Sequence, residues 1–142
     1  MGMYTGLRFK GVVKEQFREG FEEIALDGAW GDSADERLRG FANDCRASFI
    51  PCGALSYMPW YDDDEEFART YDTKTGVWTF QCSLKNYNDT IEAFLDLVPY
   101  FIENVEFCEV LYESWAWSVS YELVEGKMKE RDEFICYADS IE

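Results

Sequence analysis

Hydrophobic and polar residues alternate over residues 4–13, where Leu7 and Phe9 are each followed by a basic residue. A period of two residues places one set of side chains on each face of an extended chain, so this segment is predicted to be a half-buried strand. The same alternation recurs in the second half of the sequence. We predict further strands at 77–85, 106–112, 114–123 and from 127 toward 137, with a turn at Glu125 and Gly126 joining the last two.

Apolar residues also recur at helical spacing in three segments of the chain. The first follows the opening strand and ends at the two glycines of DGAWG. A second begins at Ser33 and Glu36, which have the spacing of a capping box, and is predicted to end before Pro51. The third covers residues 89–105 and also opens on a capping-box pattern, but Pro99 is expected to kink or split it because proline removes an N–H donor.

Residues 50–76 show no sustained period and contain two prolines, two glycines and a run of acids. They are predicted to be an irregular acidic loop, with one short strand near Leu55 at most. Together, these elements predict one α+β domain over residues 1–142, with a mainly antiparallel sheet of four to six strands and about three helices on one face. A ferredoxin-like arrangement is one topology that fits this order.

The charge balance narrows the range of partners. The chain has 29 acidic residues, 13 basic residues and no histidine, which gives a formal net charge of −16. Such a chain repels nucleic-acid phosphates and anionic lipids, so we expect no direct binding to nucleic acid or to a membrane. A basic protein is the partner that this charge favours, and acidity that only keeps the protein soluble is the alternative.

The absence of histidine also limits catalysis, because neither a serine triad nor a Cys-His pair can be built without it. A calcium loop opening at Asp62 fails as well, since Phe67 and Thr73 replace the glycine and the glutamate that an EF-hand requires. We therefore predict a protein that is not an enzyme and uses no metal and no cofactor. One alternative stays open, a carboxylate-and-aromatic ligand-binding domain or hydrolase using Glu109 and Glu113 near Trp115 and Trp117.

Five cysteines are present without a C-x-x-C pair, so no disulfide framework is predicted. The N-terminus lacks the pattern of a signal peptide, and no run of about 18 apolar residues occurs. These features predict a cytoplasmic location.

The acid run in PWYDDDEEFARTYD is the first candidate binding surface, and aromatic residues in or beside loops are candidate anchors for a partner. The acids are Asp62, Asp63, Asp64, Glu65 and Glu66. The aromatic candidates are Trp60, Tyr61, Tyr71 and Tyr87, although core packing is the alternative for each of them.

A second acidic feature is the segment 86–126, which contains nine acids and no Lys or Arg. Its helical part is expected to carry Asp89, Glu92, Asp96 and Glu103 on one face, opposite the apolar stripe. Carboxylates repeated along a rigid helix resemble the phosphates that a basic cleft expects, whereas a polar face is also what any solvated helix needs.

Small size, strong acidity and these two features, YDDDEE and the base-free segment 86–126, resemble the small acidic inhibitors of phages and mobile elements. Anti-CRISPR proteins and DNA-mimic antirestriction proteins belong to that class. The resemblance implies a non-enzymatic protein that occupies the basic nucleic-acid cleft of a defence nuclease. An immunity protein or antitoxin that neutralises a basic toxin fits the same features, and the sequence does not specify an oligomeric state.

Overall fold

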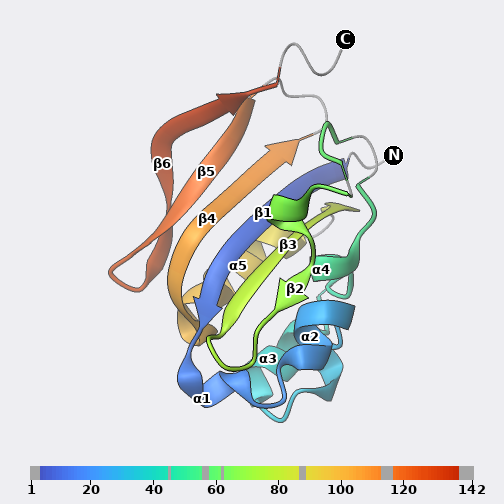
Figure 1. The fold of residues 1–142 in the computed structure, drawn as a ribbon, viewed down its shortest axis with the longest axis vertical. Helices are drawn as coiled ribbons and strands as arrows, with labels where there is room; N and C mark the ends of the chain where they lie inside the picture. Colours follow the sequence, from blue (N-terminus) through green and yellow to red (C-terminus); the bar gives the residue numbers. More distant parts are fainter. Residues whose placement is uncertain are drawn as a thin grey trace.

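A computed structural model of the chain describes residues 4–44, 46–55, 58–61, 63–86, 89–112 and 117–137. At its centre is a six-stranded sheet in the order β2-β3-β1-β4-β5-β6, in which every neighbouring pair is antiparallel (Figure 1). The strands are β1 (Tyr4–Val13), β2 (Thr70–Tyr71), β3 (Val77–Lys85), β4 (Ile102–Tyr112), β5 (Trp117–Val124) and β6 (Lys127–Cys136). The strand predictions are therefore confirmed, except that no strand forms at Leu55 and β2 occurs instead.

Five short α-helices and two 3₁₀ helices connect these strands in the described part of the chain. They are α1 (Glu15–Arg18), α2 (Glu22–Asp27), η1 (Trp30–Asp32), α3 (Glu36–Phe41), α4 (Phe49–Cys52), η2 (Glu65–Phe67) and α5 (Thr90–Phe101). The first four strands and their helical connections follow the β-α-β-β-α-β order of a ferredoxin-like arrangement, with β1 and β3 in the middle. The β5–β6 hairpin extends the sheet beyond β4.

Two of the three predicted helical segments are broken into shorter helices. The first is interrupted at Gly20, whose φ of 82° is left-handed, so α1 and α2 are separate. The second ends at Phe41 rather than near Pro51, and the chain reverses at Arg46 with a φ of 63°. Its cap is Asp35, whose side chain accepts hydrogen bonds from the amides of Arg37 and Leu38. The Ser33 hydroxyl instead accepts a hydrogen bond from the Asp35 amide.

Helix α5 continues through Pro99 without splitting and ends two residues later, at Phe101. Ile102 adopts extended backbone angles and begins β4, so Glu103 and Val105 belong to a strand and not to the helix. Proline is tolerated in this last turn of the helix, where Lys14 Nζ donates a hydrogen bond to the Pro99 carbonyl oxygen. No helix in the described part of the chain is long and apolar enough to cross a membrane.

The core lies between the sheet and α5, and it is rich in aromatic rings. Phe94 of α5 packs edge-on against Phe9 and Phe80, with ring centroids 5.7 Å and 6.1 Å away. Trp30 and Trp78 complete this cluster, and each donates its indole N–H to a backbone carbonyl oxygen. Aromatic burial of this kind supplies most of the apolar area that stabilises a domain of this size.

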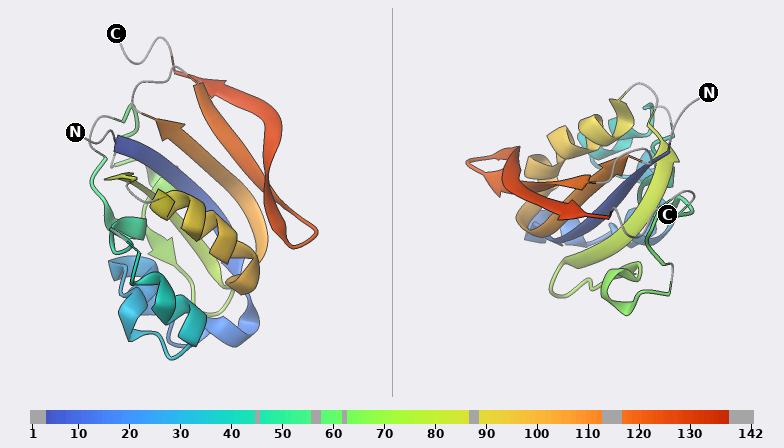
Figure 2. Two further views of the ribbon diagram at one scale, coloured as in Figure 1. Left: turned by 180° about the vertical axis from the view of Figure 1, so that it is seen from behind. Right: turned by 90° about the horizontal axis from the view of Figure 1, so that it is seen from above.

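The opposite face of the sheet is covered as well, which the alternating pattern of β3 did not predict. Thr79, Gln81 and Ser83 are all buried. Gln81 lies beneath an acidic strap, which we define as residues 58–67, with residue 62 outside the described residues. Ser83 bonds to Ala54 before the strap, and Thr79 pairs with Thr70 of β2 after it. Figure 2 shows α5 and the strap on opposite sides of the sheet.

Candidate binding surface on the acidic strap

Arg8 of β1 makes most of the contacts that hold the strap to the sheet. Its guanidinium carbon lies 4.7 Å from the ring centroid of Trp60 and 4.4 Å from that of Phe67. Arg8 therefore sits between two aromatic rings from the two ends of the strap, and each contact is a favourable cation–π interaction. The side chain of Arg8 is only 13% exposed, so these contacts form largely out of water.

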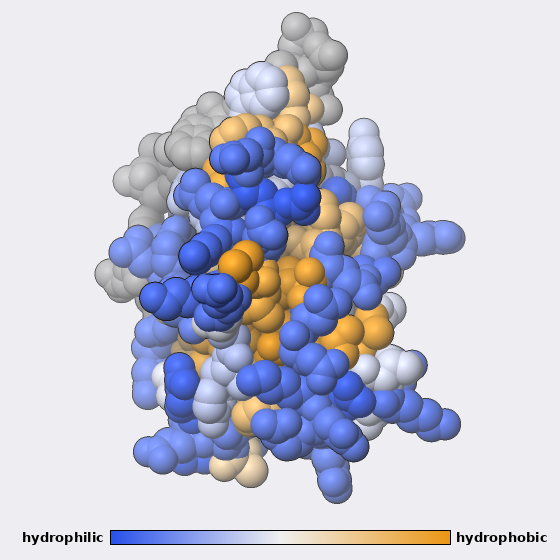
Figure 3. Space-filling model, turned by 90° about the vertical axis from the view of Figure 1, so that its left-hand side faces the viewer, coloured by the Kyte–Doolittle hydropathy of each residue, from blue (hydrophilic) through white to orange (hydrophobic). Residues whose placement is uncertain are grey.

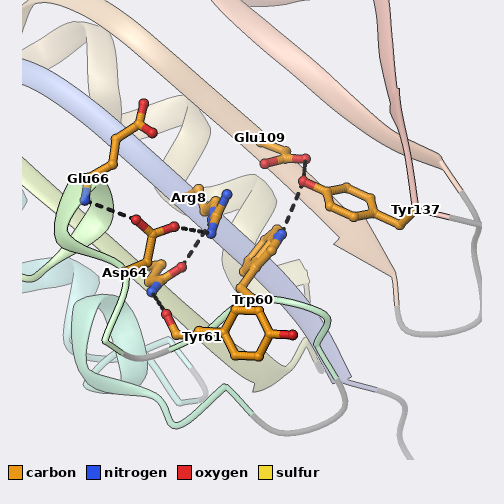
Figure 4. Close-up of polar contacts among 8 residues, drawn as sticks. Arg8, Trp60, Tyr61, Asp64, Glu66, Glu109 and Tyr137 are labelled. Carbon is orange, nitrogen blue, oxygen red and sulfur yellow. Dashed lines mark hydrogen bonds and ion pairs between the residues drawn. The ribbon is translucent and has the colours of Figure 1, made fainter. Parts of the chain in front are cut away.

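Hydrogen bonds fix the part of the strap between the two rings (Figure 4). Arg8 Nη2 donates to Asp64 Oδ2 at 3.1 Å, and Arg8 Nε donates to Gln81 Oε1 at 3.0 Å. Gln81 in turn donates through Nε2 to the carbonyl oxygen of Tyr61 at 2.6 Å. Both strap contacts start from side chains on neighbouring strands, so the sheet dictates the path of the strap.

Turning Asp64 inward leaves the other described acids of the run pointing to solvent. Asp64 also accepts a hydrogen bond from the Glu66 amide at 2.9 Å and so caps η2. Asp63, Glu65 and Glu66 are exposed, and no ion pair joins them to a Lys or Arg among the described residues. The strap thus presents three carboxylates on a turn whose backbone is tied down.

Tyr61 lies on the same turn and is the most exposed large hydrophobic residue of the described chain, at 75%. Its backbone is fixed by Gln81, while its ring makes none of the contacts drawn in Figure 4. An exposed aromatic ring on a segment that also carries exposed charges is typical of an anchor in a protein interface. The prediction that Tyr61 lies at the surface agrees with this geometry.

The other aromatic candidates lie elsewhere. Trp60 is 6% exposed and packs on Arg8, so its interpretation as an exposed anchor is wrong and the packing alternative applies. Tyr71 is half-buried against Phe21, and its hydroxyl donates to the Arg18 carbonyl oxygen, while burial raises the pKa of Tyr71 to about 12. Tyr87, like Asp62, lies outside the described residues.

The four acids predicted on one helical face are not together. Asp89 precedes α5 with a left-handed φ of 58°, and Asp96 is exposed on the helix. Glu92 is half-buried, since it accepts hydrogen bonds from Asn86 Nδ2 at 2.8 Å and Tyr112 OH at 3.3 Å. Glu103 is on β4. The prediction of a four-carboxylate helical face is therefore wrong, because the helix ends before Glu103 and Glu92 is engaged internally.

Basic residues from other elements contact the segment 86–126, which contains no Lys or Arg of its own. Lys10 of β1 pairs with Glu106 at 3.6 Å, and Arg37 of α3 stacks on Tyr100 of α5 at 4.2 Å. Because α5 and the strap lie on opposite faces of the sheet (Figure 2), their acids form two separate surfaces. Of these, the strap is the one that combines three exposed carboxylates with an exposed aromatic ring, Tyr61.

The β5–β6 side of the molecule has a different character. Hydrophilic side chains cover most of this side and surround a band of apolar ones (Figure 3). Charges of both signs occur together on β6, where Lys129 lies opposite Glu122 of β5 and Arg131 pairs with Glu133 at 2.9 Å. A surface of mixed sign is less suited to a strongly basic partner than the strap is.

A buried polar network next to the strap includes one residue of the hydrolase alternative. Glu109 has no exposed surface, and its Oε2 accepts hydrogen bonds from Ser118 Oγ at 2.6 Å and Tyr137 OH at 2.5 Å. Trp60 Nε1 donates to the same Tyr137 oxygen at 3.1 Å, whereas Glu109 Oε1 has no partner among the described residues. Burial and the bond to Glu109 raise the pKa of Tyr137.

This network was missed because its members come from distant parts of the sequence. Arg8 and Glu109 are cross-strand neighbours, which places Glu109 near the strap. The sequence does not show this, because the register is known only once the strands are paired. The Glu109 carboxylate is closed off from solvent, so it is not placed to meet a substrate. Glu113 and Trp115 lie outside the described residues, and no group of three or more Cys, Asp or Glu among the described residues is arranged to hold a metal.

No family model matches the chain, and neither a curated protein nor a solved structure is significantly similar to it. The function proposed below is therefore inferred from the geometry of the strap.

Proposed function

We propose that the protein is a non-enzymatic acidic binding protein that inhibits a basic, nucleic-acid-binding partner, such as a CRISPR or other defence nuclease, through the acidic strap. The observation that carries this proposal is that the described acids of the run have different environments. The Asp64 carboxylate pairs with Arg8, while Asp63, Glu65 and Glu66 are exposed and form no ion pair among the described residues.

An ordered turn suits this role better than a free chain would. A loop that is already tied to the sheet loses little conformational entropy when a partner binds, so more of the interaction energy appears as affinity. Exposed carboxylates at the rim raise the association rate with a basic surface, and Tyr61 supplies an aromatic group that can enter a pocket on the partner. A cleft that normally holds phosphates is a surface with the required charge.

The test compares two triple variants that each remove three negative charges. The strap variant carries Asp63→Asn, Glu65→Gln and Glu66→Gln. The control variant carries Asp89→Asn, Asp96→Asn and Glu103→Gln, and all six positions are exposed. Asn tolerates the left-handed backbone at position 89, so the control should fold normally.

We expect the wild type and the control to retain a basic nucleic-acid-binding protein from bacterial lysate at low salt, identified by mass spectrometry. The captured protein should bind or cleave its nucleic acid less well when our protein is added. Loss of about 0.5–1 kcal/mol for each carboxylate corresponds to a ten- to hundredfold weaker complex for the strap variant. Equal weakening of both variants would indicate a general charge effect and contradict the proposal, and a captured toxin without nucleic-acid contacts would favour the antitoxin alternative.

A further inference from the structure

A pocket of about 420 Å³ lies at the end of the sheet where β1 begins, β3 ends and α4 packs against them. Tyr4 and Lys85 are cross-strand partners there, and the Lys85 ammonium nitrogen lies 5.7 Å from the Tyr4 ring centroid. Its volume is in the range of pockets that hold small molecules. None of its lining residues belongs to the strap, so it is a separate feature of the molecule.

The wall of this pocket is fixed by close backbone packing. A Cβ on Gly53 would overlap the carbonyl oxygen of Ser83, so only glycine lets the chain after α4 approach β3 this closely. The Ser83 hydroxyl donates to the Ala54 carbonyl oxygen and ties the same two segments together. The pocket is therefore bounded by the sheet itself on one side and by a segment bonded to it on the other.

The charge of the pocket is opposite to that of the whole chain. Arg46 and Lys85 line it, and no acidic side chain does so among the described residues, although the chain has 29 acids and 13 bases. Arg46 also borders a neighbouring pocket whose lining includes Asp32 and Asp44. Its φ of 63° is unfavourable for a residue with a side chain, and such strain is retained more often at functional positions than elsewhere.

The remaining walls are apolar or aromatic. Phe49 is 45% exposed and lines the pocket together with Tyr4, while Leu84 in the same wall is almost fully buried. Two cations above apolar walls are complementary to a molecule that carries one anionic group on a flat hydrophobic body. We propose that this pocket binds a small aromatic anion, such as an aromatic carboxylate, sulfonate or phosphate ester.

The test uses 8-anilinonaphthalene-1-sulfonate as the anionic probe and N-phenyl-1-naphthylamine, which lacks the sulfonate, as its neutral counterpart. The variants are Lys85→Met, which keeps an apolar stem, and Arg46→Gly, which suits the left-handed backbone; Lys129→Met on β6 is the control. Fluorescence titration gives affinity and stoichiometry, and amide shifts of Ala54 and Leu84 in NMR spectra locate the probe. Circular dichroism and urea midpoints show that each variant is folded.

We expect one site for the sulfonate probe, at least fivefold weaker binding in Lys85→Met and in Arg46→Gly, and a change below twofold in Lys129→Met. The neutral probe should bind all variants within a factor of two. Salt should weaken only the anionic probe, because it screens the attraction of the sulfonate to Lys85 and Arg46 and leaves apolar contacts unchanged. The proposal is overturned if the sulfonate probe does not bind, if neither variant weakens it, or if both probes weaken alike. Should Lys85→Met fail to fold, Lys85→Gln replaces it with the same expected loss.

Discussion

Two segments that carry exposed acids, the strap and the helix α5, lie on opposite faces of one sheet (Figure 2). Helix α5 is held by apolar burial, since Ile91, Phe94 and Val98 have no exposed surface. The strap is held largely by polar and cation–π contacts, because Arg8 meets Trp60, Asp64 and Phe67 at once. A hydrogen bond from Gln81 to the Tyr61 carbonyl oxygen and the burial of the Trp60 and Phe67 rings add to these contacts. The strap contains five acids and α5 contains two, and the two segments are fixed by different balances of polar contact and apolar burial.

This difference matters for how each segment responds to change. Apolar burial scales with area and is not weakened by salt, whereas an ion pair that is partly exposed is screened. The strap should therefore open locally while the rest of the domain stays folded, and α5 should be lost only with the whole core. The following predictions test that contrast, from the largest expected effect to the smallest.

Truncation of Phe94 should remove the anchor of α5 and destabilise the whole domain. Phe94→Ala leaves a cavity among Phe9, Phe80 and Trp30, and is expected to lower the free energy of unfolding by about 3–5 kcal/mol. Urea denaturation measures this loss. Asp96→Ala on the exposed side of the same helix should change it by about 0.5 kcal/mol or less. A small loss in Phe94→Ala would mean that α5 is not held by burial.

Replacement of Arg8 should release the strap. Arg8→Met removes the ion pair to Asp64, the hydrogen bond to Gln81 Oε1 and both cation–π contacts. The expected cost is about 2–3 kcal/mol, which is less than for a fully buried pair because Asp64 is 32% exposed. Hydrogen exchange should rise in the strap and stay unchanged in α5. Lys10→Met is the control on the same strand, since the exposed pair of Lys10 with Glu106 is worth only about 0.5 kcal/mol. Equal effects of both variants would remove the special role of Arg8.

Removal of the Tyr137 hydroxyl should weaken the polar network beside the strap. Tyr137→Phe takes one of two hydrogen bonds from buried Glu109 and the acceptor of Trp60, so about 1–2 kcal/mol should be lost near neutral pH. Because the folded protein raises the pKa of Tyr137, its contribution is complete below about pH 10 and falls as pH rises further. Urea midpoints at alkaline pH should therefore decline less steeply in the variant. Parallel declines would show that this hydroxyl ionises as in an unfolded chain.

The smallest effect is expected on the helical side, at the cap of α3. Asp35 accepts hydrogen bonds from two amides and from Tyr100 OH at 2.7 Å, and Asp35→Ala should cost about 1 kcal/mol. Burial alone would raise the pKa of Asp35, but these hydrogen bonds lower it, so the contribution is present above about pH 4 and lost as pH falls through the folded pKa. Acid titration of stability measures this. Ser33→Ala should cost less, and the reverse order would restore Ser33 as the cap.

Much of the fold could be predicted because strand periodicity is local. The predicted bounds of β1 agree with the structure, and β3 and the β5–β6 hairpin were also found from alternation and a turn. The helices were harder, since Gly20 and Arg46 interrupt continuous apolar patterns with left-handed residues. A pattern shows which side of a helix is apolar but not where the chain must turn to stay on the core.

The candidate site could be predicted only in part. The sequence indicated the acid run and the exposed ring of Tyr61, but not that Asp64 turns inward, because its partner Arg8 is 56 residues away. The base-free segment was overinterpreted for the same reason. Lys10 and Arg37 come from other elements, and the sequence does not show which strands and helices become neighbours.

The alternating strands, the α+β class, the net charge and the lack of histidine follow from the sequence alone, since these depend only on composition and on short-range spacing. The tertiary structure decided which carboxylates are paired, which are exposed, and that the strap and α5 form two separate acidic surfaces. Charge pairing requires groups within a few ångströms of each other. Only strand register and the closure of the strap over Arg8 bring such groups together.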